Sequence, residues 1–144
     1  MLYLVRGLPG SGKTTLVSEI RGPEIIAADD YFMVDGEYHF DPSKLPAAHQ
    51  WCQEQCKTSL KMGLPVAVTN TFSQRWELEP YLQMATELSV RMFVLDLFDS
   101  GMSDAELHQR NVHGVPLEGI EAMRSRWEHD WGNGDPRPPW ERGA

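Results

Sequence analysis

The chain has 144 residues, 41% of them hydrophobic and 24% charged, and its formal net charge is −8. This length suits one compact domain and is too short for two of ordinary size. The negative charge argues against a protein that coats nucleic acid along its length. No apolar run approaches the ~20 residues that a membrane helix needs, and the N-terminus lacks the features of a secretory signal. We therefore expect a cytoplasmic protein without a membrane partner.

The chain opens on a predicted strand, loop and helix. Residues 2–5 form a short apolar run that leads directly into the glycine-rich sequence G-L-P-G-S-G-K-T. Residues 14–20 then show helical spacing until Gly22 and Pro23 stop it. This order indicates a βα unit with a phosphate-binding loop at its turn.

Strands and helices continue to alternate along the chain. We predict strands at 24–28, 65–68 and 90–98, helices at 43–62 and 74–88, and a long active-site loop at 33–42. The last strand is continuously hydrophobic, which predicts burial on both of its faces. The alternation favours a parallel sheet covered by helices, an α/β fold.

The remaining segments predict a helical lid and a tail. Ser103 and Glu106 form a capping box for a short helix that ends near residue 111, and Pro116 opens another that runs to about residue 128. The segment after Gly132 is rich in glycine and proline. We expect a domain over 1–131 with its lid at about 103–116, and an irregular or disordered tail over 132–144.

The glycine-rich sequence matches the P-loop, or Walker A motif, G-x-x-x-x-G-K-T. Glycines let backbone N–H groups turn toward phosphates, Lys13 reaches the terminal phosphates, and the Thr14 hydroxyl can ligate magnesium. ATP and Mg²⁺ are the expected cofactors, with Thr14 as metal ligand. The predicted nucleotide-binding residues of this loop are Gly7, Pro9, Gly10, Ser11, Gly12, Lys13, Thr14 and Thr15.

Asp29 and Asp30 follow the second predicted strand, at the sheet edge that carries the P-loop. A carboxylate there could accept the proton of an attacking hydroxyl, and only one of two adjacent side chains should face the site. The alternative is that the pair caps the segment that follows. A rival ATPase interpretation uses Asp96 as a Walker B carboxylate, although the strand continues beyond it.

Arg110 ends the predicted lid helix and could close over the phosphates as an arginine finger supplied in cis. The alternative is that Arg110 is an ordinary solvent-exposed helix residue without a functional role. Arg124 and Arg126 lie on the next helix, where pairing with nearby glutamates is the expected role.

Together these residues resemble the polynucleotide-kinase-like P-loop kinases, which include the kinase domain of bacteriophage polynucleotide kinase and a set of small ATPase-like domains. The resemblance covers most of residues 1–128 and rests on several motifs: R-G-L-P-G-S-G-K-T-T, A-D-D-Y-F, Y-H-F-D, A-H-Q-W-C, V-T-N-T and R-N-V-H-G-V-P. It implies a three-layer α/β/α P-loop NTPase fold with a parallel sheet of four to five strands and a helical lid. It also implies that Asp29 is the general base, that Lys13 and Thr14 hold ATP and magnesium, and that Arg110 contacts the phosphates.

The resemblance favours a nucleic-acid acceptor, either a polynucleotide 5′-hydroxyl or a hydroxymethylated base in phage DNA. A small metabolite hydroxyl and an ATP-binding module without phosphotransfer remain alternatives, and a phage-infected host cell is one expected setting. Relatives carry an acidic residue near the acceptor where this chain reads T-N-T-F from residue 69. The expected acceptor-binding residues are Asp30, Tyr31, Asn70 and Thr71. Aromatic residues that could stack a base, or form ordinary core, are Tyr31, Phe32, Tyr38, Trp51 and Phe72.

Overall fold

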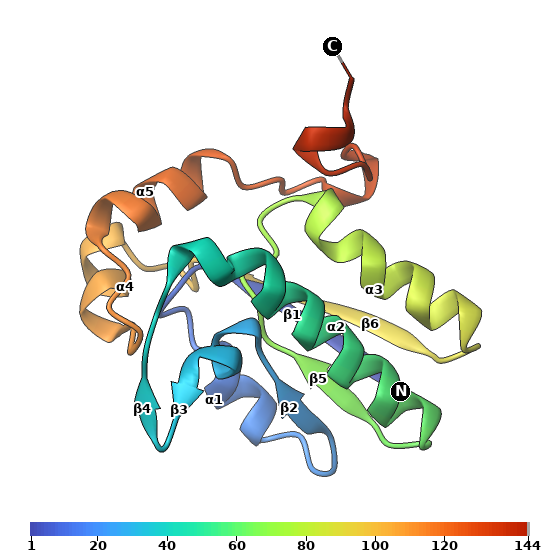
Figure 1. Ribbon diagram of the computed structural model, residues 1–144. Helices are drawn as coiled ribbons and strands as arrows, with labels where there is room; N and C mark the ends of the chain where they lie inside the picture. Colours follow the sequence, from blue (N-terminus) through green and yellow to red (C-terminus); the bar gives the residue numbers. More distant parts are fainter. Residues whose placement is uncertain (144) are drawn as a thin grey trace.

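A computed structural model describes residues 1–143 and confirms the α/β fold. Its centre is a four-stranded parallel sheet in the order β2-β5-β1-β6 (Figure 1). The strands are β1 (Leu2–Gly7), β2 (Glu24–Ile26), β5 (Val66–Val68) and β6 (Met92–Phe98). All sheet neighbours are parallel, so the carboxyl ends of the strands meet at one edge.

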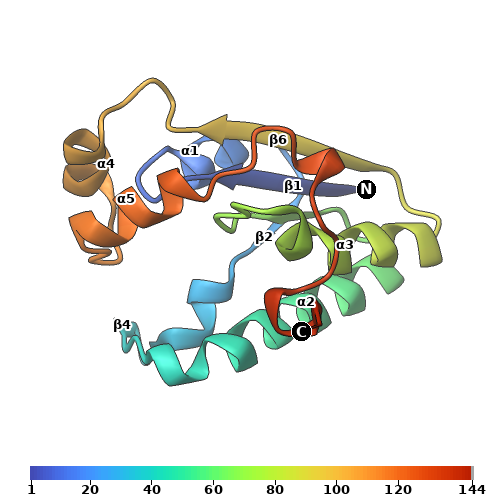
Figure 2. The same ribbon diagram turned by 90° about the horizontal axis from the view of Figure 1, so that it is seen from above.

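Helices cover both faces of this sheet, as Figure 2 shows from above. Leu2 and Leu4 point to the face packed by α2 (Leu45–Lys61) and α3 (Arg75–Glu87). Val5 points to the opposite face, which is covered by α1 (Lys13–Ser18). This alternation along one strand gives the predicted three-layer arrangement.

Strand β6 is less buried than its sequence predicts. It occupies the edge of the sheet, and its residues are half-buried or exposed along its whole length, with Phe93 41% exposed. The prediction of burial on both faces was therefore wrong. A continuous apolar sequence indicates that both faces of a strand contact apolar side chains. It does not indicate whether the strand has a neighbouring strand on one side or on both.

The predicted loop over 33–42 contains a β-hairpin. A 3-10 helix, η1 (Ala28–Phe32), follows β2, and the antiparallel strands β3 (Met33–Val34) and β4 (Glu37–Tyr38) come next. Asp35 and Gly36 form the turn with φ of 52° and 82°. Asp-Gly with positive φ at both positions is the preferred two-residue hairpin turn, so the signal was present in the sequence.

The two helices predicted after β6 are present, and the first of them lies in the predicted lid segment 103–116. Helix α4 (Asp104–Arg110) begins after Ser103, whose Oγ accepts a hydrogen bond from the Glu106 N–H at 3.2 Å, which confirms the capping box. Helix α5 (Leu117–Ser125) follows Pro116 and ends three residues earlier than expected. The two helices pack against each other over Leu107 and Ile120.

The C-terminal segment folds back over α3 (Figure 1). It contains short 3-10 helices η3 (Trp131–Asn133) and η4 (Pro139–Glu141), and a further 3-10 helix, η2 (Pro42–Lys44), precedes α2. The Trp140 ring meets the Trp76 ring edge to face at 5.4 Å. Residue 144 of the predicted tail lies outside the described residues, and among those described no helix has the length and hydrophobicity to cross a membrane.

Candidate active site

One large cleft, of about 1790 Å³, opens at the carboxyl edge of the sheet. Its walls come from the P-loop, η1, the hairpin, the start of α2, the end of β5, α3, the lid and the C-terminal segment. Every predicted P-loop residue from Pro9 to Thr15 except Ser11 lines it, and so do Asp29, Asp30, Asn70, Thr71 and Arg110. Gly7, Ser11 and Tyr31 do not: Gly7 and Ser11 are buried, and the Tyr31 ring packs against the Trp51 ring, with centroids 6.0 Å apart.

The P-loop needs glycine at Gly10 for two reasons. Its φ is +83°, and a Cβ there would collide with the carbonyl oxygen of Leu107 in α4. The loop is tied to the end of β6, because Leu8 N donates to Phe98 O at 2.8 Å and the Ser100 hydroxyl donates to Ser11 O at 2.6 Å. The phosphate loop and the lid helix are therefore in direct backbone contact.

Lys13 folds back onto the loop that carries it. Its Nζ donates to the carbonyl oxygens of Gly7 at 2.8 Å and Leu8 at 3.2 Å. Burial lowers the pKa of Lys13 from 10.5 to about 8, and the Asp29 carboxylate acts against this by favouring the ammonium form. The ammonium is thus poorly solvated where an anion would lie, and a phosphate would supply the missing counter-charge.

The residues of the loop fit a nucleotide with its magnesium ion. The N–H groups of Lys13, Thr14 and Thr15 open α1 and have no acceptor within the helix. Gly12 has a φ of +97°, and a Cβ there would meet nothing within 4 Å, so the loop leaves open space on that side. Thr14 is exposed at the cleft, where its hydroxyl could hold the metal ion.

Asp29 lies in the same cleft between two aromatic side chains. The Tyr38 hydroxyl donates to Asp29 Oδ1 at 3.0 Å, and His113 Nε2 lies 3.8 Å from Asp29 Oδ2. Burial, together with the charge of Asp29, raises the pKa of Tyr38 above its ordinary value, so the phenol stays a donor. Tyr38 comes from the hairpin and His113 from the loop after α4, so the carboxylate joins the sheet edge to the lid.

Asp30 has a different role from its neighbour. Its Oδ2 accepts a hydrogen bond from Ala27 N at 3.0 Å, which caps η1. Asn70 supports the same turn, since its Oδ1 accepts from Ala28 N at 2.9 Å and its Nδ2 lies 3.8 Å from Cys52 Sγ. These contacts fix the backbone on both sides of Asp29.

The other residues that were expected to bind the acceptor, or to stack on it, differ in how far they are exposed at the cleft. Thr71 is half-buried at the cleft, and its carbonyl oxygen accepts from Gly7 N at 3.2 Å. Phe32 and Phe72 are 3% and 2% exposed, so they belong to the core and offer no stacking face. Direct contact of Asp30, Tyr31, Asn70 or Thr71 with an acceptor stays a prediction.

Arg110 is the last residue of α4 and is exposed at the cleft. Its Nη1 lies 3.6 Å from Met102 Sδ, and no carboxylate of residues 1–143 forms an ion pair with it. A contact with ATP phosphates therefore stays a prediction, made from a side chain that is not engaged by an acidic group.

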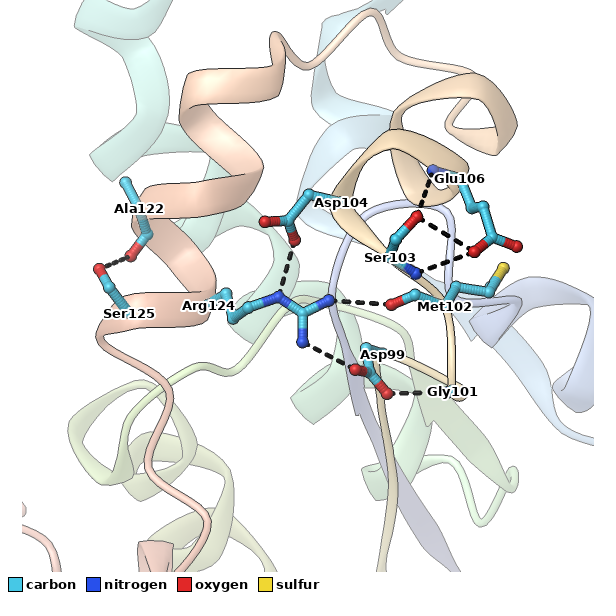
Figure 3. Close-up of polar contacts among 9 residues, drawn as sticks. All are labelled: Asp99, Gly101, Met102, Ser103, Asp104, Glu106, Ala122, Arg124 and Ser125. Carbon is cyan, nitrogen blue, oxygen red and sulfur yellow. Dashed lines mark hydrogen bonds and ion pairs between the residues drawn. The ribbon is translucent and has the colours of Figure 1, made fainter.

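Arg124 anchors the lid, as Figure 3 shows. Its guanidinium donates to Asp104 Oδ1 and Asp99 Oδ2 at 2.7 Å each and to Met102 O at 2.9 Å. The hydrogen bond from Arg124 lowers the pKa of Asp99 below its ordinary range. The expectation of glutamate partners was wrong for this residue, because Asp99, just after β6, and Asp104, the first residue of α4, lie within reach of its guanidinium. Arg126 instead lies near Ser73 Oγ, at 3.4 Å.

Asp96 is held away from the cleft by a buried cation. Arg6, its partner in the register of β1 and β6, is fully buried and donates to Asp96 Oδ2 at 3.0 Å. The strand continues to Phe98, as predicted, and Asp96 does not line the cleft. This ion pair gives Asp96 a structural role and removes the main support for the Walker B interpretation.

Sequence reasoning missed Tyr38 and His113 as neighbours of Asp29. The motifs Y-H-F-D and R-N-V-H-G-V-P contained both residues, but their spacing gave no sign that they meet. Contact between segments so distant in sequence depends on the fold of the lid over the hairpin.

Comparison with known proteins places this geometry in a family. The family model described as "AAA domain" matches residues 2–129. Human NEDD4-binding protein 2 is 33% identical over 135 residues, which cover 89% of this chain and 8% of that protein. The chain therefore spans only a small part of this curated relative.

Two solved structures show the same fold. A chain in the structure of the Pnkp1/Rnl/Hen1 RNA repair complex matches with a TM-score of 0.71 and 21% identity, over 95% of this chain and 47% of that one. A gluconokinase from Sinorhizobium meliloti matches with a TM-score of 0.57 and 18% identity, over 91% and 77% of the two chains. Given a P-loop joined to a lid and a family match over nearly the whole chain, this protein belongs to the AAA domain family and has the fold of the small P-loop kinases.

Proposed function

We propose that the protein is a magnesium- and ATP-dependent kinase that transfers the γ-phosphate to the 5′-hydroxyl of a polynucleotide. The observation that carries this proposal is the geometry at Asp29. One carboxylate oxygen accepts a hydrogen bond from Tyr38, and the other, which lies 3.8 Å from His113 Nε2, is the oxygen that we expect to receive a proton within the cleft that the P-loop lines. A hydroxyl kinase needs this combination, whereas an ATP-binding module needs only the loop.

The residues divide the reaction between them. Asp29 Oδ2 accepts the proton of the attacking hydroxyl while the oxygen of that hydroxyl forms a bond to the γ-phosphorus. The bond between the γ-phosphorus and the oxygen that bridges it to the β-phosphate breaks, which releases ADP. Lys13 leaves the Gly7 and Leu8 carbonyls for the β- and γ-phosphate oxygens, and Arg110 neutralises charge on the transferred group. Bound magnesium, held by Thr14, would supply further charge neutralisation on the phosphates.

Tyr38 and His113 act as positioning residues. The Tyr38 hydroxyl donates to the Asp29 carboxylate, and the Tyr38 and His113 rings are in tilted contact, with centroids 4.7 Å apart and planes inclined by 38°. His113 reaches Asp29 from the lid loop, so the lid must be closed for the three side chains to meet. Tyr38→Phe should preserve the ring and lower kcat about tenfold with little change in KM for ATP.

A nucleic-acid acceptor is favoured by the likeness to the Pnkp1 complex, whose TM-score exceeds that of the gluconokinase. The acidic net charge agrees with a short or single-stranded end held locally rather than a duplex gripped along its length. A small metabolite hydroxyl is the second candidate, because the gluconokinase has the same fold over most of this chain.

The test is phosphoryl transfer from γ-labelled ATP with magnesium to a panel of 5′-hydroxyl oligonucleotides, hydroxymethyl-containing DNA, nucleosides and sugar acids. We expect label on the 5′-hydroxyl oligonucleotides, and Asp29→Asn should reduce transfer by about 10²- to 10⁴-fold without loss of ATP binding. Asp30→Asn is the matched control for the change of charge, since the adjacent carboxylate caps η1, and it should reduce transfer far less than Asp29→Asn does. Label that appears solely as free phosphate, unaffected by Asp29→Asn, would refute the kinase proposal.

A further inference from the structure

Three rings lie in contact beside Asp29 in the cleft. The Tyr38 ring contacts His113, with centroids 4.7 Å apart and planes tilted by 38°, and stacks on Phe40, with centroids 6.2 Å apart and planes inclined by 12°. All three residues line the cleft, and Phe32 supports the stack from the core by edge contacts to Tyr38 and Phe40. We call Tyr38, Phe40 and His113 the aromatic stack.

The outer member of this stack is open to solvent. Phe40 is 50% exposed, although it is a large apolar residue that could have been buried in the adjoining core. Phe32, in the same segment, is buried and supplies the aromatic side chain that this part of the chain contributes to the core. Phe40 therefore offers a flat apolar face that the fold itself does not use.

The stack is linked to the proposed catalytic carboxylate by the hydrogen bond from Tyr38 to Asp29 Oδ1 and by His113, whose Nε2 lies 3.8 Å from Asp29 Oδ2. A hydroxyl that loses its proton to Asp29 must lie against the tip of the Tyr38 ring. In a 5′-terminal nucleotide the base is separated from its 5′-hydroxyl only by the sugar. The base of such an acceptor would consequently lie beside the rings that hold the carboxylate.

We propose that Phe40 and the aromatic stack bind the base of the acceptor's 5′-terminal nucleotide by π-stacking. This inference rests on the proposed function and names the part of the acceptor that the site recognises. Stacking requires no charge on the protein, so it suits a chain with a net charge of −8. It also tolerates any base, because each base presents a π-face, and it gives no advantage to a sugar acid that has none.

The test compares two single-stranded 5′-hydroxyl oligonucleotides that differ only at the first nucleotide, one with a base and one with an abasic tetrahydrofuran unit. With wild-type protein we expect kcat/KM for the base-bearing acceptor to exceed that for the abasic one by about 5- to 150-fold. Phe40→Ala should remove most of this preference, measured within the variant as the ratio of kcat/KM for the two acceptors. Phe40→Trp should retain the preference.

Phe93→Ala is the matched control, because Phe93 is a similarly exposed aromatic residue at the sheet edge that does not line the cleft. Equal use of both acceptors by wild-type protein, or the same preference in Phe40→Ala, would overturn the stacking site while the kinase proposal stands. If neither acceptor is phosphorylated, the proposal of a polynucleotide 5′-hydroxyl acceptor fails. Equilibrium binding of the two oligonucleotides by fluorescence anisotropy then decides the stacking site, since equal affinities would overturn it and a Phe40-dependent preference would support it.

Discussion

Replacing Lys13 by methionine should abolish nucleotide binding and yet not weaken the empty protein. The Lys13 side chain is half-buried, its ammonium contacts two carbonyl oxygens, and desolvation lowers its pKa from 10.5 to about 8. That difference corresponds to about 3 kcal/mol of folding free energy, lost at neutral pH by desolvating the charge. Methionine removes this cost but leaves two carbonyls without their donor, at about 1 kcal/mol each. The Lys13→Met variant should therefore be more stable than wild type by about 1 kcal/mol at pH 7.

The sign of the pH dependence makes this prediction stringent. Between pH 8 and pH 10.5 the unfolded state keeps the Lys13 proton that the folded state has lost, so wild-type stability rises with pH through this contribution. The free energy of unfolding of Lys13→Met, relative to that of wild type, should fall by about 2 kcal/mol between pH 7 and pH 9.5, so that wild type becomes the more stable protein. Subtracting the variant from wild type removes the titration of all other groups.

Urea unfolding followed by tryptophan fluorescence, without nucleotide, measures both quantities, and the chain has five tryptophans. ATP with magnesium at 100 times its dissociation constant should add about 2.7 kcal/mol to wild type and nothing to the variant. A variant that is less stable than wild type at pH 7, or a difference that does not change with pH, would refute the assignment of Lys13 as a desolvated cation.

Three further changes address the loop, the lid and β6. Gly10→Ala places a Cβ against the Leu107 carbonyl, so it should lower the free energy of unfolding by roughly 1–3 kcal/mol and weaken ATP binding in a calorimetric titration. Gly36→Ala, at a similar φ but with open space around the Cβ, should lower stability without affecting ATP binding. Arg124→Gln removes both ion pairs of the lid and should raise amide hydrogen exchange in α4 and lower kcat, while exchange in the sheet stays the same; unchanged exchange in α4 would contradict this. Asp96→Asn leaves its buried arginine partner without a counter-charge and should lower stability by about 2 kcal/mol at unchanged ATP affinity. Loss of ATP hydrolysis at unchanged stability would instead favour the Walker B interpretation.

Local signals predicted the parts of this fold that local interactions determine. The P-loop has a fixed spacing with a mechanical reason at each position, and the Ser103 and Glu106 capping box specifies a helix start through two hydrogen bonds within four residues. Both were recognisable without the structure. The Asp35-Gly36 turn belongs to the same class and was overlooked, because the strands that flank it are only two residues long.

Features that depend on distant contacts were not predictable in this way. The half-exposure of β6 follows from its place at the sheet edge, which strand hydrophobicity does not encode. The hydrogen bond from Tyr38 and the approach of His113 to Asp29 depend on how the lid sits over the hairpin. Asn70 was expected to face an acceptor, yet it also bonds to Ala28 N, and nothing near it in sequence specified that contact.

Arg6 has a consequence for where the folding unit ends. Besides Asp96, its buried guanidinium donates to the carbonyl oxygens of Phe72, Ser73 and Glu128, and it lies 4.1 Å over the Trp127 ring. Two of these contacts come from the segment after α5, which contributes nothing to the sheet. A chain cut before residue 127 would keep every strand and still expose a buried cation to partial solvation. The minimal autonomous domain should therefore extend past the last helix, and serial C-terminal truncation followed by thermal unfolding should show its steepest loss there.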